Sequence, residues 1–160
     1  MNLSKKTILL TAFKHTSADK LIKDILDFDT LFLPNDKILD SQKTIDYISK
    51  RKVDYIISIG QKPNIKDKVH IETLASKKTC NLYTSFDYEN LKILFEKNGL
   101  MAKLSNNAGT SYCNELYFNG LSYIQNIKTM QMIFIHIPYV KNISDFTEFK
   151  KRFINTIHEL

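Results

Sequence analysis

Residues 105–114 read SNNAGTSYCN and lie between a short apolar segment and a longer segment with helical spacing of its apolar residues. The short segment 100–104 before them is mostly apolar, whereas the apolar residues within 116–124 recur at helical spacing. A polar stretch between two such patterns predicts a strand, a tight turn and then a helix. Gly109 permits the tight backbone path that such a turn needs.

One cysteine, Cys113, stands immediately before the predicted helix. Thr110 or Ser111 can cap this helix, so Cys113 would lie in its first turn and feel the positive end of the helix dipole. Such a position lowers the pKa of a thiol. Its neighbours are polar, which indicates a partly exposed site. The pattern marks Cys113 as a candidate nucleophile, and a small buried structural cysteine is the alternative.

The rest of the chain alternates strand patterns with helix patterns. Continuous apolar runs predict strands at 8–13, 30–33, 55–59 and 132–137, and helical periodicity predicts helices at 17–26, 40–51, 88–98 and 144–158. This alternation predicts a single α/β domain over residues 1–160, with a mostly parallel mixed sheet between two layers of helices, a three-layer α/β/α sandwich. Ligands bind such sheets beyond the carboxyl ends of the strands.

Signals at the helix ends are less uniform. Asp40 or Ser41 can cap the second helix, whereas Asp87 and Gly99 suit the start and the end of the third. A polar loop is expected after Gly60. Residues 77–83 carry no interpretable pattern.

Composition limits the classes of function. The chain has 160 residues, 43% of them hydrophobic, which suits one domain with a real core. A net charge of +6 invites a nucleic-acid reading, but only two residues, Arg51 and Arg152, are arginines, and the lysines are interspersed with acids. A solvated surface accounts for this charge, so we expect no specific nucleic-acid partner, and nonspecific binding stays an alternative that rests on charge alone.

Other features point to an ordinary protein of the reducing cytoplasm. The chain has two cysteines, too few to staple a secreted scaffold, and no apolar run long enough to span a membrane. The histidines, cysteines and carboxylates lack metal-site spacing, and the four glycines form neither a phosphate loop nor a dinucleotide fingerprint. We therefore expect no metal and no cofactor.

A histidine interrupts the last apolar strand. His136 lies in the run IFIHIP, where its ring nitrogens need partners if they are buried. A cysteine is one candidate partner. Glu72, which would share a strand face with His70, can hold the imidazole in the required tautomer. Cys113, His136 and Glu72 would then form a nucleophilic triad, although a satisfied core histidine is the plainer interpretation.

Several separated segments, which follow one another along the chain in the same order as in the family, resemble the type I pyroglutamyl peptidases, also called pyrrolidone-carboxylate peptidases. The turn SNNAGTSYCN with the following LYF is similar to the family's nucleophile motif, and IFIHIPY is similar to its histidine strand. The Gly-Gln pair at 60–61 and the ExxA segment at 72–75 resemble its glycine-glutamine strand end and its acid segment. Residues 9–13 are similar to its first strand.

The resemblance implies a cysteine peptidase that removes N-terminal pyroglutamyl groups from small peptides with a blocked N-terminus. Cys113 would be the nucleophile, attacking as a thiolate, His136 the general base and Glu72 the third member of the triad. The substrate contacts would be Gln61 on the lactam and Phe13 on the ring, with Tyr112 beside the nucleophile. The family resemblance is also compatible with a homo-oligomer.

Departures from the family pattern concentrate in the substrate pocket. Lys14 to Ser17 follow Phe13 where the family continues Pro-Phe-Gly, and residues 76–79 lack the family arginine, whose charge Lys77 or Lys78 would have to replace. The chain is also shortened between Glu72 and Tyr88 relative to the family pattern. These departures allow altered specificity for another small acyl or lactam group. They also allow a binding or regulatory module that kept the scaffold and lost efficient catalysis.

Overall fold

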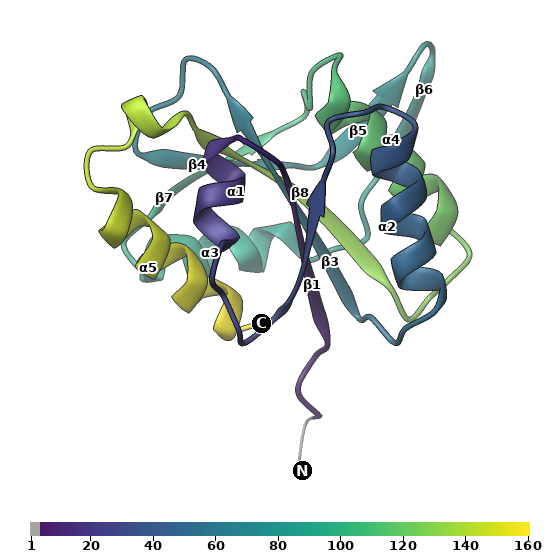
Figure 1. Ribbon diagram of the computed structural model, residues 1–160, viewed down its shortest axis with the longest axis horizontal. Helices are drawn as coiled ribbons and strands as arrows, with labels where there is room; N and C mark the ends of the chain where they lie inside the picture. Colours follow the sequence, from purple (N-terminus) through teal and green to yellow (C-terminus); the bar gives the residue numbers. More distant parts are fainter. Residues whose placement is uncertain (1–3) are drawn as a thin grey trace.

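A computed structural model describes residues 4–160 as a six-stranded sheet between two layers of helices (Figure 1). The strand order is β2-β1-β3-β8-β4-β7, and β4 and β7 run opposite to the other four strands. The strands of this sheet are β1 (Ile8–Phe13), β2 (Asp29–Leu33), β3 (Tyr55–Lys62), β4 (Lys68–Glu72), β7 (Met101–Ser105) and β8 (Gln131–Pro138). A separate antiparallel hairpin pairs β5 (Leu74–Lys77) with β6 (Cys80–Tyr83).

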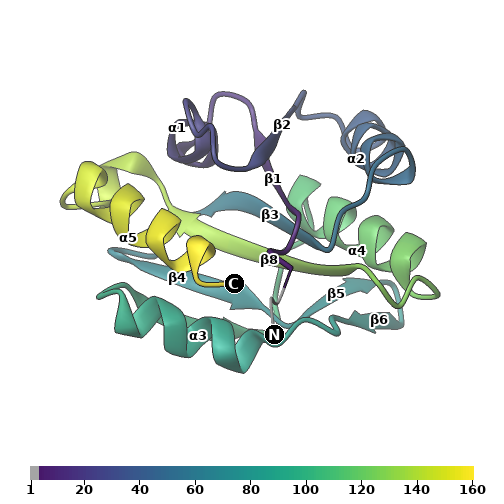
Figure 2. The same ribbon diagram turned by 90° about the horizontal axis from the view of Figure 1, so that it is seen from below.

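Helices cover both faces of the sheet, as Figure 2 shows from below. One face carries α1 (Ser17–Ile22), α3 (Tyr88–Lys97) and α5 (Phe146–His158), and the other carries α2 (Leu39–Ser49) and α4 (Tyr112–Ile124). A short 3-10 helix, η1, spans Val140–Asn142. The predicted three-layer α/β fold with a mostly parallel mixed sheet is confirmed. None of the helices described in residues 4–160 is long and apolar enough to cross a bilayer.

The central strands are buried on both faces because their side chains feed two separate cores. In β1, Ile8, Leu10 and Ala12 pack in the core under α1, α3 and α5, whereas Leu9 and Phe13 pack in the core under α2 and α4. This division explains why the sequence shows continuous apolar runs instead of alternation. It also identifies the face to which each residue of a strand belongs.

Several local expectations were wrong. The carboxylate of Asp36, not Asp40 or Ser41, accepts the backbone N–H groups of Ile38 and Leu39 at the start of α2. The uninterpretable stretch 77–83 contains the turn and second strand of the β5–β6 hairpin. The loop expected after Gly60 begins later, because β3 continues to Lys62.

We predict that Phe153→Ala destabilises the fold by about 3–5 kcal/mol, because the change leaves a cavity in the core between α3 and α5. Phe153 is fully buried, and its ring centroid lies 5.2 Å from that of Phe95. The matched control is Ile93→Ala on α3, where the side chain is 62% exposed and the loss should stay within about 0.5 kcal/mol. Urea unfolding followed by circular dichroism measures both, and similar losses for the two variants would contradict this packing.

Candidate active site

Five residues form a row across the sheet, one on each of five adjacent strands. Backbone pairing aligns Gly60 of β3 with His136 of β8, His136 with His70 of β4, and His70 with Lys103 of β7. Phe13 of β1 completes the row beside Gly60, since the preceding residues of the two strands are paired. All five lie on the α2 and α4 face of the sheet, with neighbouring strands about 4.8 Å apart. We call this set the cross-sheet row.

The thiol of Cys113 lies over the glycine of the row. A Cβ atom added to Gly60 would stand 2.6 Å from Cys113 Sγ and 2.9 Å from the ring of Phe134. Position 60 must therefore lack a side chain for α4 to approach the sheet this closely. Because Gly60 pairs with His136, the thiol and the imidazole belong to neighbouring positions.

Two further side chains of α4 fix the helix that carries Cys113. Tyr117, one turn later on the same helix face, donates a 2.8 Å hydrogen bond from its hydroxyl to the backbone carbonyl of Glu72. The Asn114 amide makes two hydrogen bonds to the backbone of Ser76, donating to its carbonyl at 2.7 Å and accepting from its N–H at 3.0 Å. Helix α4 is thereby tied to the end of β4 and to β5.

Glu72 and His136 form a buried pair. Their side chains are 0% and 4% exposed, and 2.8 Å separates Glu72 Oε1 from His136 Nδ1. Lys62 Nζ lies 3.2 Å from the same oxygen. Burial raises the pKa of Glu72, whereas the hydrogen bond to His136 and the charge of Lys62 lower it. The lowering effects prevail, so the pKa lies below its ordinary value. An ionised Glu72 requires a proton on Nδ1, which leaves Nε2 as the basic nitrogen of the ring.

The thiol itself differs from the sequence expectation. Burial raises the pKa of Cys113 to about 12, and the negative charges of Glu72 and Asp40 add to the effect. A helix N-terminus was expected to lower this pKa, and that expectation was wrong because Cys113 packs against the core under α4. Within residues 4–160, no hydrogen bond joins the thiol to the His136 ring. A raised pKa favours the neutral form of the thiol in the free protein.

Two aromatic rings pack on the thiol's face of the sheet, Phe13 from β1 and Phe134 from β8. The centroids of Phe13 and Phe134 lie 6.4 Å apart, and Phe134 lies 4.9 Å from the ring of His136. Phe13 is only 4% exposed, so the ring predicted to pack on a substrate is covered in the free protein. A substrate would have to displace part of this packing to reach it.

The other two predicted substrate contacts lie differently. The side-chain oxygen of Gln61 accepts a 3.0 Å hydrogen bond from the backbone N–H of Ser17, at the start of α1 and on the opposite face of the sheet from Cys113. The side chain of Gln61 is therefore not available to the thiol's side, and only its backbone can face a substrate there. Tyr112 is 41% exposed at the first position of α4, next to the thiol.

The structure also brings in residues that the sequence did not suggest. Lys62 is the cation beside the buried pair, and it was missed because the strand was expected to end at Gly60. Lys77 instead pairs with Glu115 at 3.0 Å, and Lys78 occupies the hairpin turn with a φ of 54°. Asp40 is 1% exposed, and its second carboxyl oxygen has no partner within the described residues.

Cys80 is exposed on the hairpin strand β6, away from the buried pair. In the part of the chain that the structure describes, His, Cys, Asp and Glu side chains form no group of three or more that is suited to a metal ion.

Solved structures of pyroglutamyl peptidases share this fold. Pyroglutamyl peptidase I from Bacillus amyloliquefaciens superposes with a TM-score of 0.86 at 18% identity, over 96% of this chain and 93% of that one. Pyrrolidone carboxyl peptidase from Fervidobacterium islandicum gives 0.81 at 17% identity, over 97% and 98% of the two chains. The Thermococcus litoralis enzyme gives 0.79 at 16% identity, over 96% and 92%.

Sequence comparison extends this likeness beyond the fold. No curated protein sequence matches the chain significantly. A model of the pyroglutamyl peptidase family, however, matches residues 63–148, more than half of the chain. The matched segment contains Glu72, Cys113 and His136. The fold and this match together show that the chain belongs to the pyroglutamyl peptidase family.

Proposed function

We propose that this protein is a cysteine peptidase that removes the N-terminal pyroglutamyl group from peptides through Cys113, His136 and Glu72. The observation that carries the proposal is the buried hydrogen bond between Glu72 and His136. His136 is paired with Gly60, the residue over which Cys113 Sγ lies. A buried carboxylate that fixes one tautomer of an imidazole beside a thiol is the arrangement that nucleophilic catalysis requires.

The chemistry follows from the protonation states. His136 Nε2 takes the thiol proton while Sγ attacks the carbonyl carbon of the pyroglutamyl amide, because a thiol with a pKa of about 12 is not ionised beforehand. The resulting imidazolium gives the proton to the departing amine, and a thioester remains on Cys113. Water then attacks the thioester, with Nε2 accepting its proton and returning it to the thiol as pyroglutamate leaves.

The start of α4 supplies the electrostatic environment for this step. Cys113 is the second residue of α4, where backbone N–H groups have no partner within the helix. These groups and the helix dipole would stabilise the oxyanion that forms during attack. Imidazole and thiol must still close into contact, as catalytic groups often do only in the complex.

The acyl side of the substrate would lie toward β1. Phe13 would pack on the lactam ring, the backbone of Gln61 would hydrogen-bond its amide, and Tyr112 would border the opening. Lys62, which lies 3.2 Å from Glu72, would supply a positive charge to the site, from which the family arginine is absent. Because Phe13 is covered and its following segment differs from the family pattern, another small acyl or lactam group is an alternative to pyroglutamate.

A second candidate function is a binding or regulatory module on the same scaffold. The raised pKa of Cys113 and the covered Phe13 are the observations that favour it. The two candidates differ in turnover, so an activity assay separates them.

We predict that the wild-type protein hydrolyses a pyroglutamyl aminocoumarin and that Cys113→Ala lowers kcat by at least about 1,000-fold, since the variant has no nucleophile. The matched control is Cys80→Ala, which removes the exposed thiol of β6 and should keep its activity. Release of the fluorescent amine measures all three proteins. Equal turnover in wild type and Cys113→Ala would refute the assignment, and no turnover in wild type would favour the binding module.

We predict that Gly60→Ala lowers kcat/KM by about 100-fold, because the added methyl group displaces Cys113 Sγ and the Phe134 ring from their positions. Gly120→Ala is the control: it also adds a methyl group between α4 and the sheet, but against the flexible end of Met132. Its kcat/KM should stay within about threefold of wild type. Equal losses of activity, measured on samples with matched thermal stability, would contradict the special role of position 60.

A further inference from the structure

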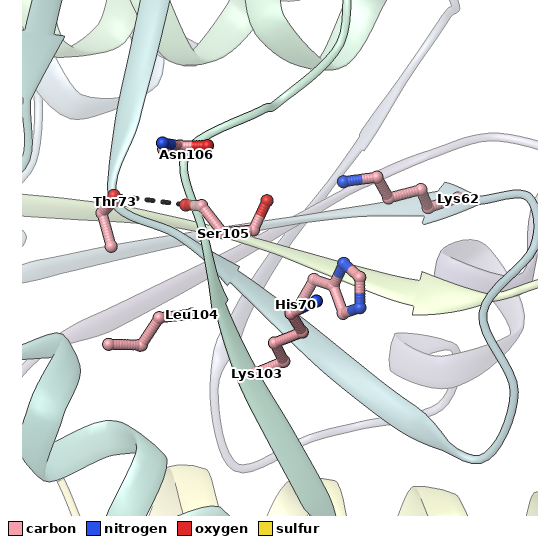
Figure 3. Close-up of a pocket in the computed structure, with 7 residues that line it drawn as sticks. All are labelled: Lys62, His70, Thr73, Lys103, Leu104, Ser105 and Asn106. Atoms are coloured by element: carbon pink, nitrogen blue, oxygen red, sulfur yellow. Dashed lines mark hydrogen bonds between the residues drawn. The ribbon is translucent and has the colours of Figure 1, made fainter.

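A cavity of about 480 Å³ opens beside the buried pair, over β4 and β7. Figure 3 shows its lining: the amine of Lys62 extends toward the β7 end, and the ring of His70 lies next to Lys103. Ser105, Asn106 and Thr73 complete the polar part of the lining. Among the described residues that line it, none is acidic, so the cavity is cationic.

The basic side chains of this cavity differ in what they already bind. Lys62 Nζ is engaged by Glu72 Oε1 and by the backbone carbonyl of Asn107, at 3.2 Å and 2.9 Å. Lys103 takes part in no ion pair across residues 4–160, and its side chain is exposed. The two ring nitrogens of His70 are enclosed, yet neither has a hydrogen-bond partner in the described part of the chain. Lys103 and His70 are thus the groups left for a ligand.

The order of residues in the cross-sheet row indicates which part of a substrate would face this cavity. Phe13 stands on one side of Cys113, and His136, His70 and Lys103 follow in that order on the other side. In the proposed reaction His136 protonates the departing amine, so the leaving peptide must lie on the His136 side. In the proposed reaction the cavity would therefore receive the leaving peptide, and the Phe13 side would receive the acyl group.

The distances suit a short leaving group. His70 and Lys103 lie one and two strand spacings beyond His136, about 5 Å and about 10 Å. An extended peptide advances about 3.5 Å per residue. A carboxylate that ends a leaving peptide of two or three residues would therefore reach the amine of Lys103.

We propose that this cavity binds a carboxylate of the leaving peptide through Lys103 and His70, and so gives the protein a preference for short pyroglutamyl peptides with a free C-terminus. This inference rests on the proposed function, because it assigns a leaving side to the same site. The same chemistry would accept an Asp or Glu side chain, so the test separates these two sources of carboxylate.

The kinetic test compares pyroglutamyl-Ala-Ala with its C-terminal amide and with pyroglutamyl-Glu-Ala amide. We expect kcat/KM for the free acid to exceed that for the amide by about tenfold, mainly through KM, and Lys103→Met to bring this ratio close to one. High salt should reduce the ratio as well. Lys151→Met, an exposed lysine of α5 on the opposite face, is the control and should keep the wild-type ratio. The Glu-containing amide shows whether a side-chain carboxylate substitutes for the C-terminus.

A binding test works without turnover. In Cys113→Ala, the His70 ring resonances should shift when the dipeptide Ala-Ala is added and shift much less with Ala-Ala amide. If the acid and the amide perturb His70 equally, or if Lys103→Met leaves the acid-to-amide ratio unchanged, the carboxylate site is wrong. If wild type cleaves no pyroglutamyl substrate but Ala-Ala still binds selectively, the proposed reaction fails while the carboxylate site stands.

Discussion

The carboxylate of Glu72 lies in the interior without exposed surface, and a buried charge is costly unless other groups compensate for it. Here His136 Nδ1 and Lys62 Nζ approach the same oxygen, and the backbone carbonyl of Glu72 is held by Tyr117 from α4. The buried charge thus connects three elements of the fold. Removing one partner would leave the others unpaired, so the tautomer of His136 and the position of α4 depend on one another.

The strand register places different side chains on the two sides of Cys113. Gly60 lets α4 approach, which puts Cys113 between the aromatic side of the row and its cationic side. In the proposed reaction the acyl group and the leaving group would have separate environments, one apolar and one positively charged. The departure that follows Phe13 lies on the acyl side, whereas the missing arginine and the shortened segment lie between Glu72 and Tyr88, where the β5–β6 hairpin stands.

Much of the fold was readable in the sequence because the two cores give long apolar runs and the helices carry clear periodicity. Cys113, His136 and Glu72 could be named from local chemistry and family motifs. Lys62 and Tyr117 could not, since their roles arise from strand register and from the contact between α4 and β4. The pKa of Cys113 was predicted in the wrong direction, because a helix position says nothing of how far the thiol is buried.

The central claim is that Cys113 stays a neutral thiol until His136 takes its proton during reaction with a substrate. The most direct measurement is the rate of Cys113 alkylation by iodoacetamide against pH, in a Cys80→Ala background without substrate. With a pKa of about 12, the rate constant should rise about tenfold per pH unit and show no plateau between about pH 6 and about pH 10. A plateau that begins near neutral pH would reveal a preformed thiolate and contradict the account.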